Sequence, residues 1–141
     1  MMGGRAVVCA VAALAASACG DASYRGSWEV VGYKRPAVSV LGDIEAQGPV
    51  GVTLEIGKET ATLAGDTCVI GSAQRQTLTM RSLEMAFDLS RGELGIPQES
   101  VEMMDLQCAT GQLDFGQQLI RVAPDSVLTP WRGVFLVLEK R

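Results

Sequence analysis

Residues 51–65 read GVTLEIGKETATLAG, and this stretch decides the fold class. Apolar and polar residues alternate over 52–56, a Gly-Lys-Glu turn follows at 57–59, and the alternation resumes over 60–64. A period of two residues is typical of a strand with one buried face, and a short turn between two such runs is typical of a hairpin. The stretch therefore predicts an antiparallel β-hairpin.

Outward from this hairpin, short runs rich in β-forming residues recur between Gly, Pro and Asp turns. Further strands are predicted over 27–34, 68–70, 76–81, 101–109, 118–123, 126–129 and 134–139. Residues 83–89 fit both a strand and a helical turn, so both alternatives stay open. A helical break is predicted between Val38 and Gln47, where Asp43 would cap a turn formed by residues 44–46.

The spacing of these elements defines a fold class. Strands near six residues, with turn signals every eight to twelve residues, predict an all-β antiparallel sandwich or barrel. No internal repeat, linker or low-complexity tract divides the chain after residue 25. Residues 26–141 are therefore predicted to be a single domain of about eight short strands with at most one short helix.

Composition excludes several function classes. The chain has 141 residues, 48% of them hydrophobic, and no histidine, which removes Ser-His-Asp triads, Cys-His pairs and imidazole zinc sites. Its net charge is −4, with no basic window, so a nucleic-acid partner is not expected. We expect a non-enzymatic protein without a cofactor or a metal.

One acidic group was a candidate for glycoside hydrolysis. Glu99, Glu102 and Asp105 lie close in sequence, but Glu102 and Asp105 point to opposite sides of a strand and Glu99 precedes it. We therefore interpret them as a solvated acidic edge that discourages aggregation. The aromatic residues, among them Tyr33, Phe115 and Trp131, are predicted to be mostly core.

The first 18 residues have the pattern of a secretory signal peptide. One Arg at position 5 precedes an apolar run over 6–16, and Ala16-Ser17-Ala18 supplies small residues for cleavage. The apolar run is too short for a permanent transmembrane helix, and a buried N-terminal helix would not need the Ala-x-Ala end.

Ala16-Ser17-Ala18-Cys19 also resembles the lipobox of bacterial lipoproteins, although that family usually has Leu where this chain has Ala16. The resemblance implies that Cys19 is acylated and begins a tether over 19–25. Ordinary cleavage before Cys19 is the alternative. Gly20 resembles an outer-membrane sorting signal, which implies export across the inner membrane and anchoring at the outer membrane, facing the periplasm.

Cysteine parity bears on both processing and folding. Cys9 leaves with the signal peptide, so an odd number remains: Cys19, Cys68 and Cys108. Lipidation of Cys19 would leave one pair. Cys68 and Cys108 could form a disulfide, a redox pair or a metal site, and a structural disulfide is favoured because there is no Cys-x-x-Cys motif and no histidine.

Gly26-Ser27-Trp28 resembles the Gly-x-Trp start of lipocalins. The resemblance implies an up-and-down barrel whose end is closed by Trp28 beneath Lys140 or Arg141. The wider layout is similar to small lipocalin-like (calycin-type) bacterial envelope lipoproteins and, more loosely, to META-domain lipoproteins, whose Gly-Cys-Asn signature has no counterpart around Cys68. The alternative is that Trp28 is an ordinary core residue of some other β-sheet.

Two functional classes follow. The first is a lipid-anchored envelope barrel that holds a small apolar ligand in its interior or mouth. The second is a protein-binding envelope module, such as an inhibitor of a cell-wall hydrolase or an envelope-maintenance factor. A large interior cavity would indicate the first class, whereas a filled interior with an exposed apolar patch would indicate the second.

Overall fold

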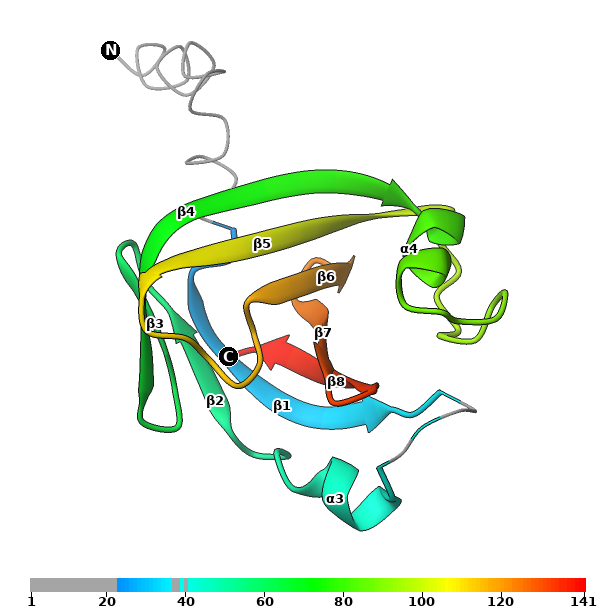
Figure 1. The fold of residues 1–141 in the computed structure, drawn as a ribbon, viewed down its shortest axis with the longest axis horizontal. Coiled ribbons are helices and arrows are strands. Elements are labelled where there is room, and N and C mark those ends of the chain that lie inside the picture. Colours follow the sequence, from blue (N-terminus) through cyan, green and yellow to red (C-terminus); the bar gives the residue numbers. More distant parts are fainter. Residues whose placement is uncertain (1–22, 37–38, 40) are drawn as a thin grey trace, which may run out of the picture.

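The computed structural model of the chain describes residues 23–36, 39 and 41–141. Within them, eight antiparallel strands close into a barrel in sequence order, so the predicted all-β up-and-down barrel is confirmed (Figure 1). The strands are β1 (Gly26–Lys34), β2 (Thr53–Ile56), β3 (Thr60–Leu63), β4 (Asp66–Thr79), β5 (Ser100–Thr110), β6 (Gln118–Ala123), β7 (Ser126–Trp131) and β8 (Val134–Lys140). The predicted signal peptide over 1–18 and the lipid site at Cys19 lie outside the described residues.

The barrel has two ends because each strand runs opposite to the one before it. The Trp28 end holds the start of β1, the end of β8 and the turns at 57–59 and 124–125. The far end holds the β1–β2 and β5–β6 loops and two hairpin turns, Ala64-Gly65 and Arg132-Gly133. Both hairpins have positive φ at each turn residue, as a two-residue turn between twisted strands requires.

Two short helices interrupt the described strands, where the sequence predicted at most one. Helix α3 (Asp43–Gln47) lies in the predicted break, but its N-cap is Gly42 and not Asp43. The Gly42 N–H donates to the carboxylate of Glu45, the third residue of the helix, at 3.0 Å. This side chain therefore provides a hydrogen-bond acceptor for a backbone N–H at the start of the helix. No helix among the described residues has the length and apolar character needed to cross a bilayer.

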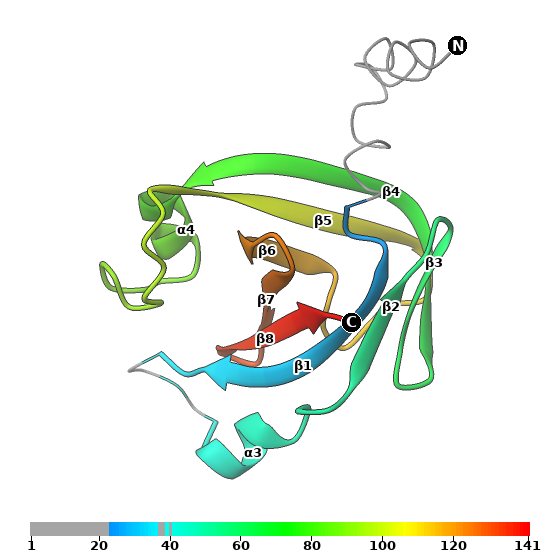
Figure 2. The same ribbon diagram turned by 180° about the vertical axis from the view of Figure 1, so that it is seen from behind.

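The undecided residues 83–89 belong largely to helix α4 (Met80–Ala86) (Figure 2). Thr79 is its N-cap, and the Thr79 hydroxyl accepts from the Ser82 N–H at 3.0 Å. A strong N-cap at the end of a strand ends the extended conformation there. The strand predicted over 76–81 therefore ends at Thr79.

Strand β4 is one long strand where the sequence predicted two separate ones. Its middle residues follow β5 through register shifts between Val69 and Ile70 and between Ile70 and Ser72. Backbone pairing with a long neighbour holds this polar stretch extended, although it lacks a clear alternating pattern. The disulfide predicted between Cys68 and Cys108 is confirmed, and it joins β4 to β5 with the Cα atoms 5.3 Å apart.

The chain builds two apolar cores on the two faces of the sheet. The inner core fills the barrel with side chains such as Leu54, Met104, Leu119 and Leu136, all at most 1% exposed. The outer core lies between the α4-containing connection and the outside of β5–β8, and consists of Leu83, Leu94, Val101, Met103, Ile120, Leu128 and Phe135. Alternation along β5–β8 sends neighbouring residues to different cores, such as Leu119 to the inner core and Ile120 to the outer core.

Candidate functional site

Trp28 and Lys140 meet at the Trp28 end of the barrel. They are direct partners in the pairing of β1 with β8, and the Lys140 ammonium lies 5.6 Å from the centroid of the indole ring. Trp28 is fully buried, and its Nε1–H donates to the Tyr24 carbonyl at 2.8 Å. The contact joins the start of the barrel to its last strand.

Arg141 does not cover Trp28. Its guanidinium pairs with the Glu29 carboxylate, and its backbone N–H donates to the Ser27 carbonyl at 2.8 Å. Successive residues of an extended chain point to opposite faces, so when Lys140 turns toward Trp28, Arg141 turns away from it.

Arg121 also covers this end of the barrel, although it was not among the residues predicted to do so. Its guanidinium carbon lies 4.3 Å from the centroid of the Tyr24 ring and 5.9 Å from that of Trp28. It also donates to the carbonyls of Ser23 and Pro124. The alternation of side chains along a strand could have predicted this position. Arg121 follows the core residue Leu119 by two positions and therefore faces the barrel interior.

Glu102 also points into the barrel, so the interpretation of it as a solvated acidic edge was wrong. The Tyr24 hydroxyl donates to Glu102 Oε1 at 2.8 Å, and Arg75 Nη2 lies 3.4 Å from Oε2. Burial, together with the neighbouring Glu102 carboxylate, raises the pKa of Tyr24 to about 12, against the opposing effect of Arg121. These groups fasten the segment before β1 onto the barrel end, which is a structural role.

The three acidic residues considered for hydrolysis do not form a pair. Asp105 faces outward and accepts from the Gln107 side chain at 3.1 Å, whereas Glu102 faces inward. Within residues 23–36, 39 and 41–141, no group of three or more Cys, Asp or Glu side chains is placed to hold a metal ion.

The described side chains fill the barrel interior. A hollow of about 30 Å³ beside Ala73 and Met104 has room for about one water molecule. At the far end, Leu113 and Phe115 of the β5–β6 loop pack into the inner core. Gly116 permits this, since a Cβ there would lie 2.8 Å from Leu54 Cδ2. The hollow beside Ala73 and Met104 therefore has no room for a ligand larger than water.

A larger hollow, the outer groove, lies outside the barrel between the α4-containing connection and the β7–β8 hairpin. Its volume is about 470 Å³. Phe87 and Leu89 form one wall, and Trp131 and Phe135 form the other. The Phe87 and Phe135 rings meet edge to face with centroids 5.2 Å apart, which joins the two walls. The groove is thus an apolar cleft between two elements distant in sequence.

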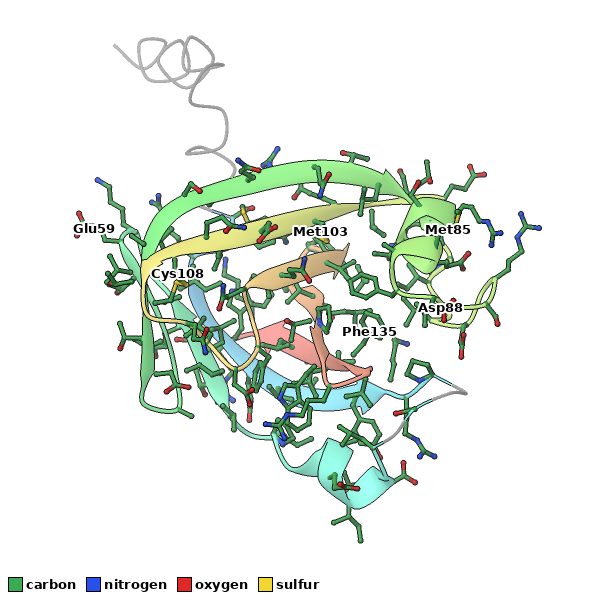
Figure 3. All side chains as sticks on the ribbon, in the orientation of Figure 1. Glu59, Met85, Asp88, Met103, Cys108 and Phe135 are labelled. Carbon is green, nitrogen blue, oxygen red and sulfur yellow. A yellow bond between two sulfur atoms is a disulfide. The ribbon has the colours of Figure 1, made fainter. Side chains whose placement is uncertain are left out.

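Charged residues line the rim of the outer groove. Arg132 stacks 4.9 Å from the Trp131 ring and lies 3.8 Å from Asp114, so its charge is partly neutralised. Asp88 is exposed, and its carboxylate makes no ion pair or hydrogen bond with the described residues. Figure 3 shows Asp88 on the connection and Phe135 on β8. The rim therefore presents an uncompensated negative charge.

Comparisons with protein-family models, curated proteins and solved structures find no match. The resemblance to lipocalin-like envelope lipoproteins therefore stays a prediction from the sequence.

A second hollow, the mouth hollow, lies at the far end of the barrel on the other side of Trp131. It has a volume of about 360 Å³ and is lined by apolar residues such as Val52, Leu63 and Phe115. The Trp131 Nε1–H donates to Asp114 at 3.0 Å, which fixes the ring between this hollow and the outer groove. Trp131, predicted as core, is therefore a half-buried wall of two surface hollows.

Proposed function

We propose that the protein is a non-catalytic binding protein of the bacterial envelope that takes up a small, mainly apolar molecule. The signal-like residues 1–18 and the lipobox-like sequence ending at Cys19 support export and a lipid anchor at the outer membrane, on its periplasmic side. The barrel supports a binding role because a rigid scaffold holds surface loops in place.

The outer groove carries this proposal. Small-molecule sites are typically apolar clefts of roughly 300–1,000 Å³ with a few polar groups, and the groove has about 470 Å³. The barrel interior is filled, so the ligand site is outside the barrel. The Phe87 and Phe135 rings are in edge-to-face contact, so together they give the groove a continuous aromatic lining against which an apolar molecule can pack.

The rim defines the charge of the ligand. Asp88 is not neutralised by a described neighbour, whereas Arg132 is held by Asp114. A carboxylate at the edge of an apolar cleft repels anions and attracts cations and hydrogen-bond donors. The preferred ligand is therefore neutral or cationic at its polar end.

Two fluorescent probes of similar shape test this assignment. The neutral N-phenyl-1-naphthylamine should bind the full-length protein more tightly than the anionic anilinonaphthalene sulfonate. Asp88→Asn should strengthen binding of the anionic probe and so narrow the difference in Kd between the two probes. Asn tolerates the positive φ of 56° at this position. Asp125→Asn, at the Trp28 end, is the matched control and should change neither probe.

A blocking variant locates the site. Ser90 lines the outer groove and is exposed, so Ser90→Trp should fill the groove and abolish binding of the neutral probe. Thr62→Trp adds the same side chain on exposed β3 and should leave binding intact. Unchanged binding in Ser90→Trp would place the site elsewhere. Failure of the wild type to bind the neutral probe would contradict the proposed function.

A second candidate function, a protein-binding module, is favoured by one observation. The β1–β2 loop exposes Ile44 by 88% and Val50 by 44%, beside a filled barrel. Apolar side chains exposed on the same connection offer surface for a protein contact. A photo-crosslinking residue at position 44 in intact cells should label an envelope protein, whereas one at Thr62 should not. Equal labelling at both positions would argue against this function.

A further inference from the structure

Strand β4 has a long edge that no strand covers. Strand β3 pairs with β4 only from Asp66 to Val69, whereas β4 continues along β5 to Thr79. Among the described residues, no other strand pairs with the stretch after Val69. Figures 1 and 2 both show this part of β4 at the outer rim of the barrel. Its backbone is therefore available to another chain.

The hydrogen-bond pattern identifies which backbone groups point outward. Just past the end of β4, the Met80 N–H donates to the carbonyl of Glu99, the residue before β5, whereas the Leu106 N–H of β5 donates away from β4, to the Gln117 carbonyl. Backbone groups of an antiparallel pair alternate in direction from one residue to the next. Given the register from Ser72 to Thr79, Ala73, Arg75 and Thr77 direct both their N–H and C=O to the open edge. Thr79 directs its N–H there, whereas its carbonyl, as that of the N-cap, accepts the first hydrogen bond of α4.

This open edge lacks the usual protection against pairing. Edge strands are commonly blocked by charges, Pro or bulges. Residues 72–79 read SAQRQTLT, with no Pro and one charge, Arg75, which lies 3.4 Å from Glu102. The register shifts of β4 fall before this stretch, between Val69 and Ser72. The edge is thus regular, extended and close to electrically neutral.

We propose that two copies of the protein pair through this edge, β4 against β4, about a two-fold axis at Gln76. In this register Ala73 lies opposite Thr79 of the second copy, and Arg75 lies opposite Thr77 of the second copy. Each of the four outward residues then lies opposite another of the four, which no other two-fold register of this edge achieves. A two-fold axis at Arg75 would instead oppose two like charges, which is destabilising.

The barrel leaves room for this pairing. Strand β3 occupies the edge of β4 only as far as Val69, and the proposed pairing begins at Ala73. The Ile70 N–H still donates to the Glu59 carbonyl, in the turn before β3, at 2.8 Å, so Gly71 and Ser72 separate that contact from the proposed pairing. The β2–β3 hairpin and the incoming strand therefore do not compete for the same backbone groups. The residues from Gln74 to Thr77 are exposed, which leaves their side chains free to line the new contact.

Cysteine cross-linking tests the register. Gln76 would face its own copy across the axis as a non-hydrogen-bonded pair, with Cα atoms about 4.5 Å apart, a distance that a disulfide spans. Gln76→Cys should therefore give a disulfide-linked dimer under mild oxidation of the full-length protein. Gln74→Cys would be offset from its copy by about 13 Å and should not. The wild type under the same oxidation reports any cross-link through Cys9 or Cys19.

Sedimentation velocity tests the contact without cross-linking. The wild type should dimerise, and Thr77→Pro, which removes an outward N–H but no bond to β5, should raise the dimer Kd by about tenfold or more. Thr77→Ala keeps the N–H and should not change it. Gln76→Lys leaves the backbone intact, places like charges at the axis and should weaken the dimer in a salt-dependent way. This variant decides the question if circular dichroism shows that Thr77→Pro is unfolded.

Three results would overturn the proposal. The first is a wild type that stays monomeric up to its solubility limit. The second is a dimer that Gln76→Lys leaves unchanged. The third is equal cross-linking of the variants at Gln74 and Gln76, which would indicate random collision.

Discussion

Removing the Trp28 ring and the Lys140 charge, separately and together, measures how the barrel end is closed. Trp28 is fully buried in the inner core, so Trp28→Ala should lower the free energy of unfolding by about 3–5 kcal/mol. Lys140→Met keeps the length of the side chain but removes the charge 5.6 Å from the ring. Because Lys140 is only half-buried, its loss should cost about 0.5–1 kcal/mol.

The two effects should be less than additive. Once the ring is absent, Lys140→Met has less to remove, so the double variant should be more stable than the sum predicts by up to about 0.5–1 kcal/mol. Arg141→Met is the matched control on the neighbouring residue. It breaks an exposed ion pair with Glu29, should cost about 0–1 kcal/mol, and should add to Trp28→Ala.

Urea unfolding followed by far-ultraviolet circular dichroism gives all the required free energies without depending on tryptophan fluorescence. Additivity of Trp28→Ala and Lys140→Met within about 0.3 kcal/mol would mean that the charge and the ring do not interact in solution. Coupling of Trp28 with Arg141 instead would mean that the C-terminus is placed differently at the barrel end.

Three further predictions concern processing, the disulfide and pH. Cys19→Ala should release the protein from membranes or leave its precursor uncut, and an unchanged membrane fraction would argue against lipidation. Replacing both Cys68 and Cys108, which are 40 positions apart, by Ser should lower stability by about 4 kcal/mol, and an unchanged urea midpoint would count against this. Folding raises the pKa of Tyr24 from 10.0 to about 12, so protonated Tyr24 stabilises the folded state below pH 10, and this stabilisation should be lost as the pH rises from 10.0 to about 12. Tyr24→Phe should flatten this fall in the free energy of unfolding, which urea titrations at several pH values would measure.

The strands were predictable where one face of the sheet meets an apolar core. Leu54 and Ile56 alternate with exposed residues, and so do Ala61 and Leu63, and each pair is buried as the pattern indicates. The polar middle of β4 was not predictable, because pairing with β5 and not its own pattern holds it extended. Local sequence carries no information about a distant pairing partner.

The candidate site was harder to predict than the fold. Arg121 and Glu102 face the barrel interior, but a charge within a strand ordinarily indicates a solvent face. The sequence of helix α4 was ambiguous because its apolar residue Leu83 packs into the outer core. The strand pattern of a barrel does not predict a second core outside the barrel. The outer groove was not predictable because two of its wall residues, Phe87 and Phe135, lie far apart in sequence. They meet only when the connection folds back over β8.

Residues 80–99 are attached to the barrel through the outer core and can open and close as one cooperative unit. Leu83 and Leu94 attach this connection to the barrel wall, while the eight strands close without it. It can therefore open locally at a free energy below that of global unfolding, and its amides should exchange with deuterium faster than those of β8. Because Phe87 and Leu89 belong to this unit, a molecule seated in the outer groove would hold it closed. Slower exchange confined to residues 80–99 would then be a signature of occupancy that needs no change in the barrel.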